Sequence, residues 1–316
     1  MNRRITEKLK IPESIRIPFF GAKWYQFLSM LDNKEILREP IQPIPINKEP
    51  RDELVTVSLT SYPARINVVH LAIKSLLNQS YKPDRIVLWL AESQFQNQEL
   101  PTELLNLKSF GLEIRFCSED LLGHKKHYMA VKEQQENEVV VTYDDDIIYP
   151  KDSLERLMKL HRMYPKCIIC NRAQAMEYDD SGNVKNPGRW KTISDIGVDE
   201  PTWKLLPSNG GGVLYPYHSL CQDSYNVAKI KSMCLRADDL WMMFMALQNG
   251  TKTIKTRKYH KTFTVIGDSQ TNQLATDNIL NNGYLTLLNN MILNYPEAWK
   301  RVIDNSIPYI RERGKN

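Results

Sequence analysis

Long apolar runs, paired cysteines and strong net charge are all missing from this sequence of 316 residues. No stretch of about eighteen apolar residues occurs, which argues against a transmembrane helix. The segment MNRRITEKLKIPESIRIPFF begins with charge but has no continuous apolar core or small-residue cleavage site, so we expect no signal peptide. Repeats, P-loop spacing and the dinucleotide-binding glycine fingerprint are absent too.

The five cysteines are an odd number in a long chain, which is typical of a reducing cytoplasm. Cys167 and Cys170 lie in the apolar run CIIC, where residues three apart on a strand point to opposite faces. We therefore predict free or buried thiols and no metal site there. A net charge of +5 suits an anionic substrate or an acidic membrane surface, and is too weak to predict nucleic-acid binding.

The composition, 42% hydrophobic and 25% charged, is that of an ordinary soluble globular protein. We predict an N-terminal extension over residues 1–50, a catalytic domain over 51–267 and a C-terminal helical tail over 268–316. The extension is rich in proline and contains one helical patch at 23–37. It is either a surface-packed segment or a basic, aromatic one that rests on a membrane.

From residue 54 onward, short apolar runs alternate with amphipathic ones. We expect strands at 54–60, 85–91, 112–117, 138–143 and 167–170. Helices are expected at 66–78, 100–107, 124–135, 151–164, 236–248 and 276–287. This alternation predicts an α/β fold with a mostly parallel sheet and helices on both faces. Ligands then bind beyond the carboxyl ends of the strands.

An acidic triplet, Asp144-Asp145-Asp146, directly follows the buried strand-like run VVVTY. Adjacent like charges need compensation, and a divalent cation would supply it. Side chains at i and i+2 face the same way, so Asp144 and Asp146 can share one ion. Oxygen ligands favour Mn²⁺ or Mg²⁺. The alternative is a solvated turn that caps the next helix, which accounts for one aspartate and not three.

Three segments give the sequence a family resemblance. TYDDDIIY resembles the D-x-D motif of GT-A glycosyltransferases, while VSLTSYPARI and SLLNQSYKPDRIVLWL are similar to segments of bacterial capsule and lipopolysaccharide glycosyltransferases related to family 2. The resemblance spans about residues 54–266. It implies a GT-A-like fold and transfer of a sugar, most simply from a UDP-sugar, to a saccharide acceptor. Asp144 would then lie near the donor ribose and Asp146 would bind the metal.

The same resemblance implies further contacts to the donor. Tyr62 could stack on the base and Arg65 could meet a phosphate. At Glu92, where relatives often have an acidic residue contacting the base, this sequence has Ala-Glu-Ser instead of Asp-Asp-Gly-Ser. Lys125 and Lys126 could reach the diphosphate, or could form a solvated helix start. The complete predicted donor set is Thr60, Ser61, Tyr62, Arg65, Glu92, Lys125, Lys126, Asp144 and Asp145.

The segment ADDLWMMF resembles the family's element that carries the catalytic base. It implies Asp239 as the base, Asp238 in support and Trp241 shaping the acceptor pocket. An acceptor hydroxyl must lose its proton as it attacks, which requires a carboxylate within hydrogen-bond reach. The alternative is a helix start with acids placed favourably on the helix dipole.

Several other residues have weaker claims. Gly211 and Gly212, in NGGG, could let the backbone approach an acceptor, or could belong to a plain loop. His260 could be a further metal ligand or an ordinary strand residue. Trp190 and Trp203 could line a sugar site or lie in the core.

Two other functions remain open: a phosphatase of the haloacid dehalogenase type, and a saccharide- or nucleotide-binding module without catalysis. A sugar-nucleotide pyrophosphorylase would need an N-terminal glycine-rich loop that is missing. For the transferase, the resemblance implies a saccharide or lipid-linked glycan acceptor and inverting chemistry. It also implies a cytoplasmic location, at the inner face of the plasma membrane if the acceptor is lipid-linked.

Overall fold

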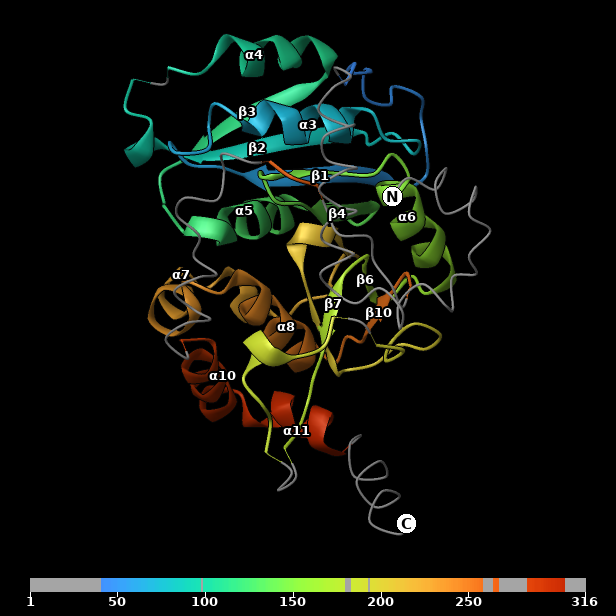
Figure 1. The fold of residues 1–316 in the computed structure, drawn as a ribbon, viewed down its shortest axis with the longest axis vertical. Coiled ribbons are helices and arrows are strands. Elements are labelled where there is room, and N and C mark those ends of the chain that lie inside the picture. Colours follow the sequence, from blue (N-terminus) through green and yellow to red (C-terminus); the bar gives the residue numbers. More distant parts are fainter. Residues whose placement is uncertain are drawn as a thin grey trace, which may run out of the picture.

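A seven-stranded sheet forms the centre of the protein (Figure 1). The computed structural model describes residues 41–97, 99–179, 183–192, 194–257, 264–266 and 283–304. The strand order is β10-β6-β9-β4-β1-β2-β3. The strands are β1 Leu54–Thr60, β2 Arg85–Ala91, β3 Leu112–Cys117, β4 Glu138–Thr142, β6 Ile168–Cys170, β9 Val213–Tyr215 and β10 Thr253–Lys255.

The sheet is mostly parallel, as predicted. Strand β1 pairs in parallel with β2 and β4, β2 pairs with β3, and β6 pairs with β10. One detail differs from the predicted alternation, because β9 runs antiparallel between β4 and β6. It comes from the glycine-rich segment that we expected to be irregular. Its three residues are too few to show a period in the sequence.

Helices cover both faces of the sheet, as predicted. On one face, α3 (Val69–Leu77), α4 (Thr102–Leu105) and α6 (Ser153–Met163) share an apolar core with Val139 and Val141 of β4. On the other, α5 (Lys125–Glu133) and α8 (Asp238–Asn249) share a core with Val140. Alternate residues of β4 thus enter opposite cores, which explains why the strand is apolar throughout.

The remaining elements are short. Two small antiparallel pairs join β5 (Ile147–Ile148) to β11 (Thr264–Val265) and β7 (Ala173–Ala175) to β8 (Leu205–Pro207). Short helical turns are η1 Glu92–Gln94, η2 Asn106–Phe110, η3 Leu122–His124, η4 Pro187–Arg189, η5 Asn209–Gly211, η6 Gln222–Tyr225, α7 Val227–Lys229 and the π-helical η7 Ile230–Cys234.

Two C-terminal helices, α10 (Gly283–Asn294) and α11 (Pro296–Asp304), lie against α8 (Figure 1). Trp299 stacks on Phe244 with ring centroids 5.9 Å apart, and Tyr295 meets Trp241 edge-on at 6.2 Å. We expected a helix at 276–287; its first seven positions fall outside the described residues, and the observed helix continues to Asn294. The predicted tail therefore shares a core with the sheet.

Other predictions from the sequence can be placed on this structure. Only residues 41–50 of the expected N-terminal extension are described, and Ile46 and Asn47 donate backbone hydrogen bonds to Phe110 and Pro83. All five cysteines are free thiols, as predicted. No helix within the described parts of the chain combines the length and apolar character that crossing a bilayer requires.

Candidate active site

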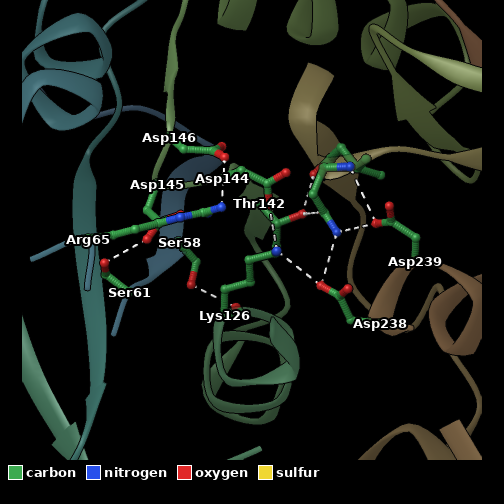
Figure 2. A network of polar contacts seen from close by, with 12 residues as sticks. Ser58, Ser61, Arg65, Lys126, Thr142, Asp144, Asp145, Asp146, Asp238 and Asp239 are labelled. Atoms are coloured by element: carbon green, nitrogen blue, oxygen red, sulfur yellow. Dashed lines mark hydrogen bonds and ion pairs between the residues drawn. The ribbon is translucent and has the colours of Figure 1, made fainter. Parts of the chain in front are cut away.

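The acidic residues singled out from the sequence meet at the carboxyl end of β4 (Figure 2). Asp144 and Asp146 follow β4 directly, and Asp238 and Asp239 occupy the first turn of α8. We call these four residues the acidic cluster. They come from segments that are more than 90 residues apart in the chain, so the fold and not the local sequence brings them together.

Lys126 links the two halves of the acidic cluster (Figure 2). Its Nζ lies 2.7 Å from Asp144 Oδ1 and 3.0 Å from Asp238 Oδ2, and its side chain is only 6% exposed. Burial alone would lower the pKa of Lys126, but Asp144, Asp238 and Asp239 raise it well above its usual value. The Ser58 hydroxyl donates to the Lys126 carbonyl at 2.7 Å, which fixes the start of α5 on β1. Lys126 is therefore a charged ammonium, held in place between carboxylates.

Asp145 points away from Lys126 and holds Arg65. It accepts a hydrogen bond from Ser61 Oγ at 2.6 Å and pairs with Arg65 Nη1 at 2.7 Å. Arg65 Nη2 in turn lies 3.1 Å from Asp146 Oδ2. We expected Ser61 and Asp145 to contact the donor; both are buried and instead position the guanidinium beside Asp146.

Asn209 connects the end of β4 to the start of α8 through its side-chain contacts. It accepts a hydrogen bond from Thr142 Oγ1 at 2.5 Å. Its side-chain amide donates to Asp239 Oδ1 and, at 3.4 Å, to Asp238 Oδ2, while its backbone N–H donates to Asp239 Oδ1 at 3.3 Å. From the sequence we had grouped Asn209 with the glycines that follow it. Its contacts orient the carboxylate predicted to be the base.

The carboxylates of the acidic cluster titrate differently. Burial, aided by the charges of Asp238 and Asp144, raises the pKa of Asp239 well above its ordinary value. Burial and Asp144 raise the pKa of Asp146 to about 6, against the opposing effect of Arg65. Burial would also raise the pKa of Asp238, but Lys126 and the nearby His124 and His127 hold it below its ordinary value.

Among the described residues of this region, acidic side chains outnumber basic ones. Five carboxylates, those of the acidic cluster and Asp145, are opposed by three basic side chains: Lys126, Arg65 and Arg172. Burial lowers the pKa of Arg172, although Asp239 and Asp144 counteract it. A divalent cation would offset this acidic excess, and the carboxylate oxygens of Asp144 and Asp146 are suitable ligands for Mn²⁺ or Mg²⁺. Arg172 was not identified from the sequence.

His127, also missed in the sequence, lies next to the acidic cluster. It occupies the first turn of α5 and is buried. Burial lowers its pKa from 6.5 to about 3. One ring nitrogen of His127 and one carboxylate oxygen each of Asp238 and Asp239 all lie within 4.8 Å of one another.

The buried, neutral imidazole of His127 predicts a pH-dependent stability. Because the folded protein holds this ring uncharged down to about pH 3, the unfolded chain binds more protons between pH 6.5 and 3. The stability that His127 contributes is therefore complete above pH 6.5 and is lost as the pH falls. Between pH 7 and pH 5 we expect the wild type to lose about 2 kcal/mol more unfolding free energy than His127→Gln. Urea unfolding of both proteins at both pH values, with chelator present, measures this difference. Equal losses of unfolding free energy in the wild type and His127→Gln would contradict the prediction.

The remaining predicted donor residues lie around Arg65 or at the ends of β1 and β2. The Arg65 guanidinium sits over the Tyr62 ring at 5.5 Å from its centroid. Thr60 Oγ1 donates to the Trp89 carbonyl, and Glu92 is exposed. Lys125 corrects a prediction: its Nζ pairs with Asp120 at 2.6 Å and its side chain is buried, so it does not join Lys126.

The predicted acceptor residues have structural roles. Trp241 is fully buried among apolar residues and has no surface to offer an acceptor. A side chain at Gly211 would meet Arg172 Cβ at 2.5 Å, and one at Gly212 would meet the Tyr143 ring at 2.3 Å. The two glycines are thus explained by close packing of the backbone. Contact of Gly211, Gly212 and Trp241 with an acceptor stays a prediction.

Gly212 has a φ of +88°, and the Tyr143 ring beside it is held in place by Tyr149 and Ser153. Both features predict that a side chain at this position destabilises the fold. We expect Gly212→Ala to lower the unfolding free energy by about 2–5 kcal/mol, combining backbone strain with a clash. Gly250, with φ +75° and no atom nearer than 3.7 Å, is the matched control. Gly250→Ala should cost only about 1 kcal/mol. If chemical unfolding shows the same loss of unfolding free energy for both variants, the contact with Tyr143 does not contribute to stability.

Three further residues complete the predicted set. His260 lies outside the described residues. Trp190 is buried in the core, with its indole N–H donating to the Lys185 carbonyl at 2.8 Å. Trp203 is partly exposed and lies under the Lys252 ammonium, 4.7 Å from the ring centroid.

Comparison with known proteins gives no family. No model of a protein family matches the sequence, and no curated protein matches it. Solved structures do match. A mannosyltransferase from Pyrobaculum calidifontis, in complex with GDP-Man and Mn²⁺, is 16% identical with a TM-score of 0.40, over 73% of this chain. This chain covers 62% of that protein, less than two thirds of its length.

Two further structures have a similar level of likeness. A 4-diphosphocytidyl-2C-methyl-D-erythritol synthase from Anaerococcus prevotii is 12% identical, with a TM-score of 0.44, over 74% of this chain and 99% of its own. Residues 1–349 of TarS from S. aureus are 12% identical, with a TM-score of 0.44, over 83% of this chain and 74% of that one. At these identities and scores the likeness does not bear on activity.

Proposed function

We propose that this protein is a metal-dependent glycosyltransferase that moves a sugar from a nucleoside diphosphate donor, with UDP-sugars the first candidates, to a saccharide acceptor. One observation carries the proposal: Asp144 and Asp146 meet Asp238 and Asp239 around a buried Lys126 at the carboxyl end of β4. Such a site has one end suited to a cation and its phosphates and another suited to proton removal.

At the donor end, Asp144 and Asp146 would hold Mn²⁺ or Mg²⁺. The cation supplies charge neutralisation for the departing diphosphate. Arg65, held by Asp145 and stacked beside Tyr62, places a fixed positive charge at the same end. Lys126 provides a second positive charge between the two ends of the site.

At the acceptor end, Asp239 is the proposed general base. Its Oδ1 is fixed by the side chain and backbone of Asn209. A carboxylate whose pKa is raised by burial is, once ionised, a stronger proton acceptor than an ordinary one. The acceptor hydroxyl gives its proton to Asp239 as its oxygen forms a bond to the anomeric carbon, while the bond from that carbon to the diphosphate oxygen breaks. This single displacement inverts the anomeric centre.

We further propose a growing cell-surface glycan of the capsule or lipopolysaccharide kind as the acceptor. This choice rests on the similarity of residues 57–66 and 75–90 to enzymes of that kind. A lipid-linked acceptor would place the protein at the cytoplasmic face of the plasma membrane. The net charge of +5 is compatible with an acidic membrane surface.

The proposal is tested by Asp239→Asn, which keeps the size of the side chain and removes the proton acceptor. With Mn²⁺ and a panel of nucleotide sugars and glycan acceptors, we expect the wild type to release nucleoside diphosphate and the variant to be about 10²–10⁴-fold slower. Binding of the nucleoside diphosphate should remain. Asp223→Asn, which removes a carboxylate paired with Lys229 outside the site, is the control.

Other products would contradict the proposal. Release of inorganic phosphate from monoesters would indicate a phosphatase. Tight nucleotide binding with equal, negligible turnover in wild type and variant would indicate a binding module.

A further inference from the structure

His127 is not used by the proposed transfer reaction, yet its surroundings are unusual. The side chain is only 1% exposed, and neither Nδ1 nor Nε2 has a hydrogen-bond partner among the residues that the structure describes. Burying a polar group without a partner costs about 1–3 kcal/mol. Tyr215 packs edge-on against the ring at 5.6 Å and so fixes its plane without satisfying its nitrogens. Buried polar groups in folded proteins usually have a partner, so we expect this imidazole to bind a group or an ion.

The groups nearest to His127 are carboxylates with a free oxygen. Asp238 uses Oδ2 for Lys126 and Asn209, and Asp239 uses Oδ1 for Asn209. Within the described part of the chain, no hydrogen bond reaches Asp238 Oδ1 or Asp239 Oδ2. One ring nitrogen of His127 and one carboxylate oxygen of each aspartate lie within 4.8 Å of one another. Atoms that share one ion at about 2.1 Å lie at most about 4.2 Å apart, so the group needs to close only slightly.

We propose that His127, Asp238 and Asp239 form a second divalent-cation site, separate from the oxygen-only pair Asp144 and Asp146. One imidazole nitrogen with two carboxylates suits Mn²⁺, Co²⁺ or Zn²⁺ and is unfavourable for Mg²⁺, which prefers oxygen ligands.

Charge does not oppose a second ion. Lys126 lies close, but it contacts Asp238 at Oδ2 and is shared with Asp144. Among the described residues of the region, five carboxylates face three basic side chains, so the surroundings favour a cation over an anion.

Occupation of this site has a consequence that rests on the proposed function. An ion bound to Asp239 removes that carboxylate as a proton acceptor. Activity should then rise with Mn²⁺ and fall again at higher concentration, whereas Mg²⁺ should only activate. The binding test below needs no activity, so failure of the site and failure of the proposed function can be told apart.

The test is Mn²⁺ binding to the full chain without nucleotide, in an excess of Mg²⁺ that fills the oxygen-only site. We expect one bound Mn²⁺ per chain, with electron spin echo modulation from a directly coordinated histidine nitrogen. In His127→Gln the modulation should vanish and Mn²⁺ should bind more than about tenfold more weakly. His218→Asn, which removes an exposed histidine, should keep both.

Labelling the wild type with ¹⁵N-histidine gives a result that does not depend on the folding of a variant. The modulation should shift from the ¹⁴N to the ¹⁵N pattern. Absence of any histidine coupling in the wild type, or coupling that persists unchanged in folded His127→Gln, would overturn the proposal.

Discussion

The double variant Asp144→Asn, Asp146→Asn is expected to release nucleoside diphosphate at least about 10³-fold more slowly than the wild type in saturating Mn²⁺. Amide oxygens keep the shape of the carboxylates but not the charge that holds a divalent cation. The loss should appear in turnover and in Mn²⁺ affinity together, measured by nucleotide release and by calorimetry.

The same double variant should remain folded. Burial and the charge of Asp144 raise the pKa of Asp146 to about 6. The ionised carboxylate of Asp146 therefore destabilises the folded protein relative to the unfolded chain. Removing this like-charge repulsion should offset the loss of the contact between Asp144 and Lys126. The control is Asp152→Asn with Asp223→Asn, two carboxylates paired elsewhere on the protein. A folded double variant with wild-type turnover would exclude a cation on Asp144 and Asp146.

Lys126→Met is expected to lower the unfolding free energy by about 3–5 kcal/mol in chelator. The substitution leaves Asp144 and Asp238 facing each other without the ammonium that now lies between them. Urea unfolding measures the loss. Added Mn²⁺ should restore part of it, because a bound cation replaces some of the missing positive charge.

Lys125→Met is the matched control for Lys126→Met. Lys125 is the neighbouring residue on α5 and is equally buried, but its single partner, Asp120, is partly exposed and can be solvated when left alone. Lys125→Met should lower the unfolding free energy clearly less than Lys126→Met does, and added Mn²⁺ should not change this effect. Equal losses for the two lysines, both independent of Mn²⁺, would show that Lys126 is only an ordinary buried ion pair.

The class of fold and the position of Asp144 and Asp146 could be predicted from the sequence because both depend on local patterns. Strands apolar on both faces, each followed by an amphipathic helix, specify a parallel sheet with two covered faces. The triplet lies just beyond the end of β4, where Asp144 pairs with Lys126 and Asp145 contacts Ser61 and Arg65. The pattern could not show that Asp145 positions Arg65, because that contact spans 80 residues.

The parts that the sequence did not reveal depend on tertiary packing. His127 is one residue from Lys126 on α5, and only the docking of α5 against α8 brings it to Asp238 and Asp239. Arg172 and Asn209 reach the site from short segments without periodicity. For Trp241, a local motif suggested a role that the tertiary packing does not support. Its motif resembles a pocket-lining element, yet α8 turns that side toward α11 and buries the indole against Tyr295.

The central claim is that the acidic cluster holds a cation which in turn binds the diphosphate of a donor. Crystals of the protein grown with Mn²⁺ and UDP, measured at the manganese absorption edge, test this most directly. The account predicts an anomalous peak within about 2.5 Å of carboxylate oxygens of Asp144 and Asp146 and of diphosphate oxygens. Manganese and nucleotide bound together at another place, with the acidic cluster contacting neither, would contradict it.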